Sequence, residues 1–178
     1  MTITWNEYQQ QALTTAIYPL DRSLDYTAFG LLSELGELVG AREIERRNPT
    51  EGKPLVIGEL GDNFWYTAAL SDAIEKPLNE VYHFTTTKRP QTAEQSMDAL
   101  IFLGGLIAGH LKKAIRDDAG HLTPERRKLI VGCLSRYMHH LEFISSDYSS
   151  VPGVLNDNLN KLNSRKQRGV LGGAGDNR

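Results

Sequence analysis

The sequence predicts an all-α protein. Apolar residues recur at the three- and four-residue spacing of helices, and no stretch alternates apolar and polar residues as a strand does. Prolines and capping residues divide the chain into segments of helical length. With 178 residues, 40% of them hydrophobic and 24% charged, the chain can bury a core without a disulfide or a structural metal. We therefore expect a helical bundle.

Four helices are expected in the N-terminal half. Asn6 is a suitable cap for the first, and Pro19 stops it because proline cannot donate a backbone hydrogen bond. Asn48-Pro49 ends the second helix, and Pro77 ends the third. The expected bounds are Asn6 to Tyr18, Tyr26 to Arg47, Pro54 to Glu75 and Leu78 to Phe84.

Three more helices are expected in the C-terminal half. Thr123 caps the middle one, with Pro124 at its first position. Segment 85–91 is the linker candidate between the halves, and segment 169–178 holds four glycines and is expected to be a flexible tail. The expected bounds are Thr92 to Arg116, Thr123 to Ile144 and Val154 to Arg165.

The two halves look related. Residues 78–81, Leu-Asn-Glu-Val, are echoed by Val-Pro-Gly-Val at 151–154, and residues 36–38 are echoed at the same offset by 109–111. This register favours a duplication inside a single domain over 1–178, with a metal-binding unit at 5–89 and a degenerate unit at 92–168. A chance match between two helical hairpins is the alternative.

Charge and apolar content limit the classes of partner. The chain has 20 basic and 22 acidic residues, a net charge of -2, so we expect no nucleic-acid partner. No apolar run approaches the roughly 20 residues of a membrane span, so we expect no membrane partner. The N-terminus lacks the features of a signal peptide, and the lone Cys133 cannot form an intrachain disulfide. These features favour the cytoplasm, or the host cytoplasm for a viral protein.

Two acidic strings stand out, Glu34-Leu35-Gly36-Glu37 and Glu59-Leu60-Gly61-Asp62. In each, the acids are one helical turn apart, where like charges repel, and a glycine interrupts the helix at a cost of about 1 kcal/mol relative to alanine. One cause explains both liabilities: two helices pack closely at the glycines and direct four carboxylates into one space. Oxygen ligands alone suit Mg²⁺, with Mn²⁺ able to substitute. The alternative is that each pair is solvated helix surface.

At these residues the sequence resembles the MazG-like members of the all-α nucleoside triphosphate pyrophosphohydrolase superfamily. That family has two adjacent glutamates with a third three residues later, followed by a glutamate and an aspartate three apart. Glu34 and Glu37 match the second and third glutamates, whereas Ser33 stands in place of the first. Glu59 and Asp62 match the later pair.

The closing residues 158–178 also resemble those of phage and bacterial MazG-like proteins. In a simple family member this closing run follows the acidic strings directly, so the chain resembles two fused family units. The resemblance implies a Mg²⁺-dependent enzyme that cleaves a nucleoside triphosphate between its α and β phosphates. It assigns the catalytic and metal-binding roles to Glu34, Glu37, Glu59 and Asp62. Candidate substrate contacts are Asn158, Lys161, Arg165 and Arg168 for the phosphates, and Trp65 and Tyr66 for stacking on a base.

Several alternatives stay open. A di-iron oxidase needs paired Glu-x-x-His elements, and the chain offers only Glu80 with His83. A non-catalytic nucleotide-binding or regulatory protein with a decayed site is favoured by Ser33 and by the acid-poor second half. The base and sugar of the substrate are open, with deoxyguanosine triphosphate as an early candidate. Paired helical units lead us to expect a homodimer, although duplication can satisfy the pairing within one chain.

Overall fold

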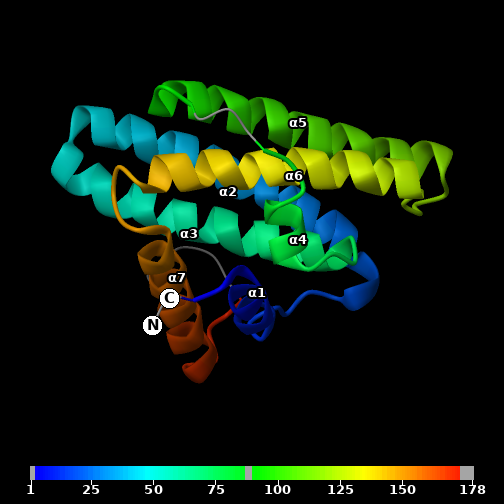
Figure 1. The fold of residues 1–178 in the computed structure, drawn as a ribbon. Helices are drawn as coiled ribbons and strands as arrows, with labels where there is room; N and C mark the ends of the chain where they lie inside the picture. Colours follow the sequence, from blue (N-terminus) through cyan, green and yellow to red (C-terminus); the bar gives the residue numbers. More distant parts are fainter. Residues whose placement is uncertain (1–2, 87–89, 173–178) are drawn as a thin grey trace.

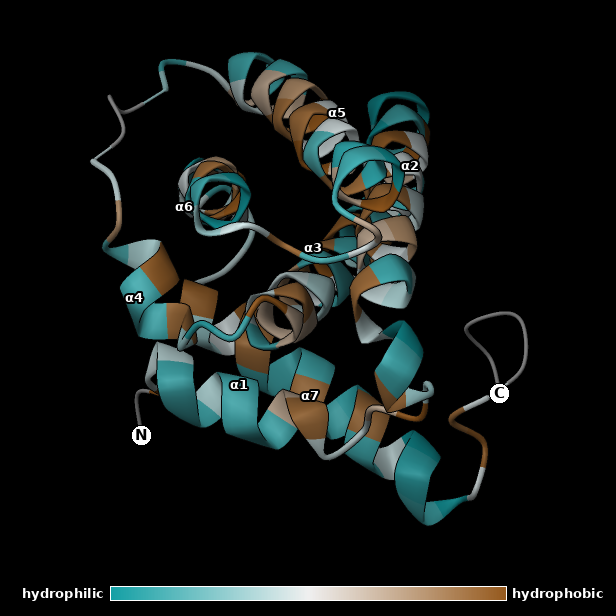
Figure 2. Cartoon of the chain, turned by 90° about the vertical axis from the view of Figure 1, so that its right-hand side faces the viewer, coloured by the Kyte–Doolittle hydropathy of each residue, from teal (hydrophilic) through white to brown (hydrophobic). Residues whose placement is uncertain are grey.

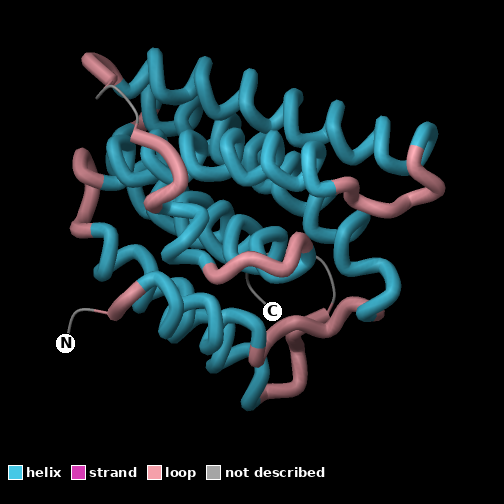
Figure 3. Tube along the Cα trace, turned by 45° about the vertical axis from the view of Figure 1, so that its right-hand side comes forward, coloured by secondary structure: helices cyan, strands magenta, loops and turns pink. Residues whose placement is uncertain are grey.

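The computed structural model describes residues 3–86 and 90–172. Within these ranges the chain forms seven α-helices, one short 3₁₀-helix and no strand, which confirms the all-α prediction (Figure 3). None of the helices described is long and apolar enough to span a bilayer. The elements are α1 (Trp5–Leu13), η1 (Leu20–Arg22), α2 (Ser23–Arg47), α3 (Pro49–Ala73), α4 (Leu78–Tyr82), α5 (Ala93–Asp117), α6 (Pro124–Ser145) and α7 (Val151–Gln167).

The four long helices α2, α3, α5 and α6 form the body of the molecule (Figure 1). Helix α2 packs along α3, and α5 packs along α6. In the view turned by 90°, α3 lies between α2, α5 and α6 on one side and α1 with α7 on the other (Figure 2). The hydrophobic core of the described residues draws side chains from both halves of the chain.

Helix α3 is the central helix, because it contacts α1, α2, α4, α6 and α7. It buries polar side chains as well as apolar ones. Its buried residues are Gly52, Val56, Glu59, Leu60, Gly61, Asn63, Phe64, Trp65, Thr67, Ala68, Ala69, Leu70 and Ser71.

The expected bounds of the first helix are wrong at both ends. Thr4, not Asn6, is the cap: its hydroxyl accepts from the Glu7 N–H at 3.3 Å, and the Glu7 carboxylate accepts from the Thr4 N–H at 2.8 Å. The helix ends at Leu13 because the next two residues, Thr14 and Thr15, bond back to preceding carbonyls through their hydroxyls.

Helices α3 and α7 begin earlier than expected. Pro49 occupies the first position of α3, where its missing N–H costs no helical hydrogen bond, so the sequence signal at Pro54 lies inside the helix. Ser150 caps α7 by accepting from the Gly153 N–H. This helix ends at Gln167 in a Schellman motif, with Gly169 at a φ of 71° as its left-handed residue.

Helix α2 also begins earlier than expected, at Ser23 rather than at Tyr26, and ends at Arg47 as expected. Thr92 and Thr123 cap α5 and α6 as expected, and Pro124 is at the first position of α6. Helix α4 ends at Tyr82 rather than at Phe84. Linker residues 87–89 and tail residues 173–178 lie outside the described residues, so the linker and the flexible tail stay predictions. The internal duplication stays a prediction.

Candidate metal centre

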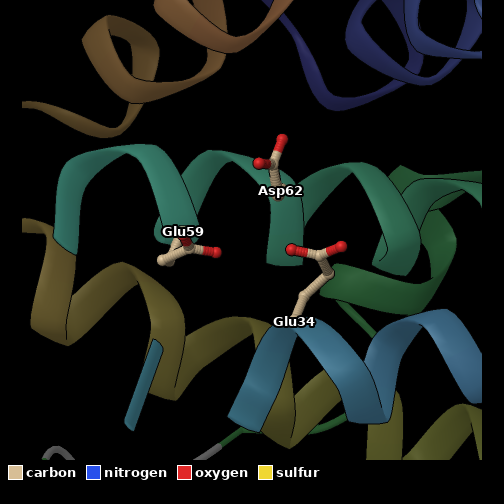
Figure 4. Close-up of side chains that lie close together, drawn as sticks. All are labelled: Glu34, Glu59 and Asp62. Carbon is tan, nitrogen blue, oxygen red and sulfur yellow. The ribbon is translucent and has the colours of Figure 1, made fainter. Parts of the chain in front are cut away.

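Three carboxylates converge where α2 packs along α3. Glu34 projects from α2 and Glu59 lies on α3 beside it, whereas the Asp62 carboxylate points away from α2 (Figure 4). Each side chain offers one oxygen atom, and these three atoms all lie within 4.8 Å of one another. The local spacing of Glu59 and Asp62 puts them one turn apart on α3, whereas the packing of α2 supplies the third carboxylate.

Burial and the neighbouring negative charges raise the pKa of Glu34. Glu34 is half-buried, and only 9% of the surface of Glu59 is exposed. Burial, followed by the negative charges of Asp62, Glu37 and Glu59, raises the pKa of Glu34 to about 8. A proton or a cation at this point therefore relieves an unfavourable concentration of charge.

Glu37 stands apart from the converging group. Its exposed side chain accepts a hydrogen bond at 3.4 Å from the hydroxyl of Ser33, the residue at the position of the missing first glutamate. The charge of Glu37 still contributes to the raised pKa of Glu34. The structure thus brings together three of the four expected ligands and places the fourth at their edge.

The expectation that α2 and α3 pack together at Gly36 and Gly61 is wrong. A Cβ added at Gly36 meets nothing within 4 Å, because two residues along a helix is a rotation of about 200° and this position faces away from the carboxylates. A Cβ at Gly61 would lie 2.9 Å from the Cβ of Asn158 on α7. Helix α2 instead approaches α3 closely at Gly30, where a Cβ would lie 1.8 Å from the ring of Tyr66.

Helix α7 closes one side of the cluster at Asp62. The amide Nδ2 of Asn158 donates to Asp62 Oδ1 at 2.7 Å, and the ammonium of Lys161 donates to Asp62 Oδ2. Tyr8 of α1 donates in turn to Asn158 Oδ1 at 3.1 Å. Both oxygens of Asp62 therefore already have protein donors, and two of the expected phosphate contacts lie beside the carboxylates.

The two expected arginines lie further along α7. Arg165 is 4% exposed, and its backbone carbonyl accepts from the Val170 N–H at 2.9 Å. Arg168 is exposed at the end of the helix, where its Nε donates to the Ser164 carbonyl at 3.4 Å. Arg168 thus bonds to its own helix through its side chain, and Arg165 is buried.

Trp65 is a core residue. Its side chain is 8% exposed, and its indole Nε1 donates to the Ala12 carbonyl at 3.1 Å and to the Thr15 hydroxyl at 3.0 Å. These bonds attach the end of α1 to α3. The indole is thus used for packing rather than offered to a base.

Tyr66 borders the carboxylates. It is partly buried, and its hydroxyl donates to that of Tyr26 at 3.4 Å. Burial raises the pKa of Tyr66, with smaller contributions in the same direction from Tyr26, Glu34 and Asp62. Of the two aromatic candidates for stacking, Tyr66 is the one beside the acidic cluster.

Sequence reasoning missed the residues behind the cluster. Asn63 is fully buried next to Asp62, and its amide bonds the backbone of both α2 and α3. Tyr137 of α6 is also fully buried and donates to that amide. The available signal was an amide that directly follows the second acidic string, one turn after Glu59.

The donor set fits a small divalent cation. Oxygen atoms on opposite sides of Mg²⁺, each at 2.0–2.1 Å from the ion, are about 4.2 Å apart. Only one pair among three ligands can be opposite each other, and adjacent ligands of an octahedral ion are about 2.9 Å apart. The three carboxylate oxygens, which lie within 4.8 Å of one another, must therefore draw closer together to bind one ion. Glu34, Glu59 and Asp62 can then hold Mg²⁺ or Mn²⁺, and such an ion offsets the repulsion that raises the pKa of Glu34.

Among known proteins, the chain is similar to the Gene 37 protein of Mycobacterium phage L5, with 39% identity over 80 residues. The similarity spans 44% of this chain and 70% of the phage protein, and it supports the predicted association with phage. No protein-family model matches the chain. No solved structure matches it either.

Proposed function

The chain belongs to the family of the Gene 37 protein of Mycobacterium phage L5, and we propose that it is a Mg²⁺-dependent nucleoside triphosphate pyrophosphohydrolase. The products are pyrophosphate and a nucleoside monophosphate. The observation that carries the proposal is the convergence of one oxygen each of Glu34, Glu59 and Asp62 within 4.8 Å, at a site flanked by the ammonium of Lys161 and the amide of Asn158 on α7.

The carboxylates are proposed to hold the metal. A bound Mg²⁺ supplies a bridge to phosphate oxygens and lowers the pKa of a coordinated water. Glu59 and Asp62 fix the donors on α3, and Glu34 adds the donor from α2. With a pKa of about 8 in the cation-free site, the Glu34 carboxyl is mostly protonated at neutral pH, so a cation that binds there would displace this proton.

Helix α7 is proposed to receive the phosphates. Lys161 and Asn158 lie against Asp62, so both can turn from this carboxylate to phosphate oxygens when a cation takes their place. Arg165 and Arg168, further along the helix, are proposed to meet the outer phosphates. Tyr66 is proposed to border the nucleoside, and deoxyguanosine triphosphate is the first substrate to test.

Product identification tests this function directly. The protein is incubated with each common ribo- and deoxyribonucleoside triphosphate and Mg²⁺, and the products are separated chromatographically. We expect monophosphate and pyrophosphate in equal amounts, with no reaction in EDTA. Diphosphate and phosphate as products, or no turnover of any triphosphate, would contradict the proposal.

A non-catalytic nucleotide-binding or regulatory protein is the second candidate. It is favoured by the ion pair of Lys161 with Asp62, which occupies an expected metal ligand, and by Ser33 in place of a family glutamate. On this proposal a triphosphate binds and stays intact. Equilibrium binding measured beside product release separates the two functions.

We also propose that the protein acts as a homodimer in the host cytoplasm. Exposed apolar side chains support association: Phe29 on α2 is 68% exposed and Phe102 on α5 is 62% exposed. Sedimentation equilibrium of the full chain tests the dimer, and a monomer at micromolar concentration would contradict it.

A further inference from the structure

Asn63 joins the two helices that carry the carboxylates. Its Nδ2 atom donates to the backbone carbonyl of Glu34 on α2 and to that of Glu59 on α3, both at 2.9 Å. These are the residues whose side chains meet at the candidate metal centre. One amide therefore fixes the relative position of α2 and α3 at the point where the two glutamates leave their backbones.

Tyr137 holds that amide from the other half of the chain. It lies on α6, and its hydroxyl donates to Asn63 Oδ1 at 2.6 Å. Both side chains are completely buried. An amide can rotate by half a turn and exchange its oxygen and nitrogen, but a hydroxyl donor on Oδ1 favours the orientation in which Nδ2 faces both glutamates.

We infer that Asn63 and Tyr137 are positioning residues that hold Glu34 and Glu59 in register for a divalent cation. The inference rests on the metal site of the proposed function and extends it to the second half of the chain. That half supplies none of the three converging carboxylates, yet its α6 contributes the hydroxyl that orients the amide behind them. Partners that orient metal ligands commonly change metal affinity by roughly 10- to 100-fold.

The direct test is Tyr137→Phe, which removes the hydroxyl and leaves the ring. Mg²⁺ binding to the full chain is measured by titration calorimetry, without nucleotide, at a temperature where the variant is folded. We expect the Kd for Mg²⁺ to rise roughly tenfold. In turnover assays the Mg²⁺ concentration for half-maximal rate rises by the same factor, while the rate at saturating Mg²⁺ changes less.

Tyr82→Phe is the matched control. Tyr82 also donates a hydrogen bond of 2.6 Å to a side chain on α6, namely Glu142, away from the three carboxylates. It therefore reports the effect of losing a tyrosine hydroxyl from the helix packing alone. We expect its Mg²⁺ affinity to match that of the wild type within twofold.

A double variant separates positioning from stability. Removing one partner leaves a buried polar group without its hydrogen bond, whereas replacing both by apolar groups of similar shape is nearly neutral. Asn63→Leu with Tyr137→Phe is therefore expected to retain most thermal stability yet bind Mg²⁺ at least tenfold more weakly. Mg²⁺ binding to this double variant tests the positioning role even where the single variant Tyr137→Phe folds poorly.

The outcomes distinguish this inference from the proposed function. If both variants bind Mg²⁺ as tightly as Tyr82→Phe does, the positioning role is overturned, whatever the enzyme hydrolyses. If the wild type binds Mg²⁺ and hydrolyses no triphosphate, the proposed function fails while weakened binding in the variants still supports the positioning role. If the wild type binds no Mg²⁺, both fail.

Discussion

The hairpin of α2 and α3 and the hairpin of α5 and α6 use their inward-facing polar groups differently. In the first, one oxygen each of Glu34, Glu59 and Asp62 lies within 4.8 Å of the other two, and the pKa of Glu34 is raised to about 8. In the second, the buried polar groups include the hydroxyl of Ser135, which lies 3.2 Å from that of Thr85, and the hydroxyl of Tyr137, which donates to Asn63. The concentrated charge lowers the stability of the first hairpin, whereas the second hairpin stabilises the first and orients its side chains.

The largest expected effect is on the first hairpin. Glu59→Gln is expected to reduce Mg²⁺-dependent hydrolysis at least about 100-fold, because loss of a ligand exceeds the loss of an outer partner. Without Mg²⁺, the same variant melts no lower than wild type, since one of the repelling charges is gone. Initial rates and thermal melts in EDTA check both results.

Glu142→Gln is the control for that variant. It removes one carboxylate from α6, where Tyr82 is the donor. We expect nearly unchanged hydrolysis and slightly lower stability. If the two variants were equally active, the division between the hairpins would be wrong.

Next in size is an apolar truncation in the second hairpin. Leu134→Ala removes a fully buried side chain on α6 and is expected to lower the free energy of unfolding by about 2 to 5 kcal/mol. At a temperature where it is folded, its Kd for Mg²⁺ should stay close to that of the wild type. Urea unfolding and calorimetry check this, and a large loss of metal affinity without a loss of stability would reverse the comparison.

A smaller effect is expected where α7 meets the first hairpin. Lys161→Met keeps the length of the side chain and removes the charge that pairs with Asp62. We expect kcat/KM to fall roughly 10- to 100-fold, the equivalent of about 1.5 to 3 kcal/mol for a charged hydrogen bond. Lys166→Met is the control on the same helix. It removes a lysine that donates to the Thr14 carbonyl, at the end of α1, and should change kcat/KM less than threefold.

The pH dependence of stability is a further expected difference. Glu34 ionises near 4.5 in its ordinary state and near 8 in the folded chain, so the folded state holds its proton more tightly. Its contribution to stability is therefore complete below pH 4.5 and is lost as the pH rises to about 8. Melting curves in EDTA between pH 5 and 8 measure this fall, and Glu34→Gln is expected to flatten it.

The smallest effect is expected for Glu37, which lies outside the converging group. Glu37→Gln is expected to change Mg²⁺ affinity less than threefold, because its exposed carboxylate acts on Glu34 only through its charge. Calorimetric titration with Mg²⁺ is the measurement. A loss as large as that of Glu59→Gln would restore the four-ligand site that the sequence predicts.

Much of the helical arrangement was accessible before the structure. Thr92, Thr123 and Pro124 act through hydrogen bonds and backbone angles of their immediate neighbours, so α5 and α6 begin where local rules place them. The end of α1 was missed because two threonine hydroxyls and the indole of Trp65 compete for its last carbonyls. The threonine bonds are local, but the indole comes from a helix 50 residues later.

By itself, the sequence determined that the chain is helical and that its acids recur one turn apart, since both depend on the geometry of a single helix. Only the tertiary structure decided that Glu34 joins the pair on α3 while Glu37 does not, and that Tyr137 reaches Asn63. These contacts depend on how each helix is rotated about its axis. That rotation is set by burying the apolar surface of all seven described helices together, which no local spacing specifies.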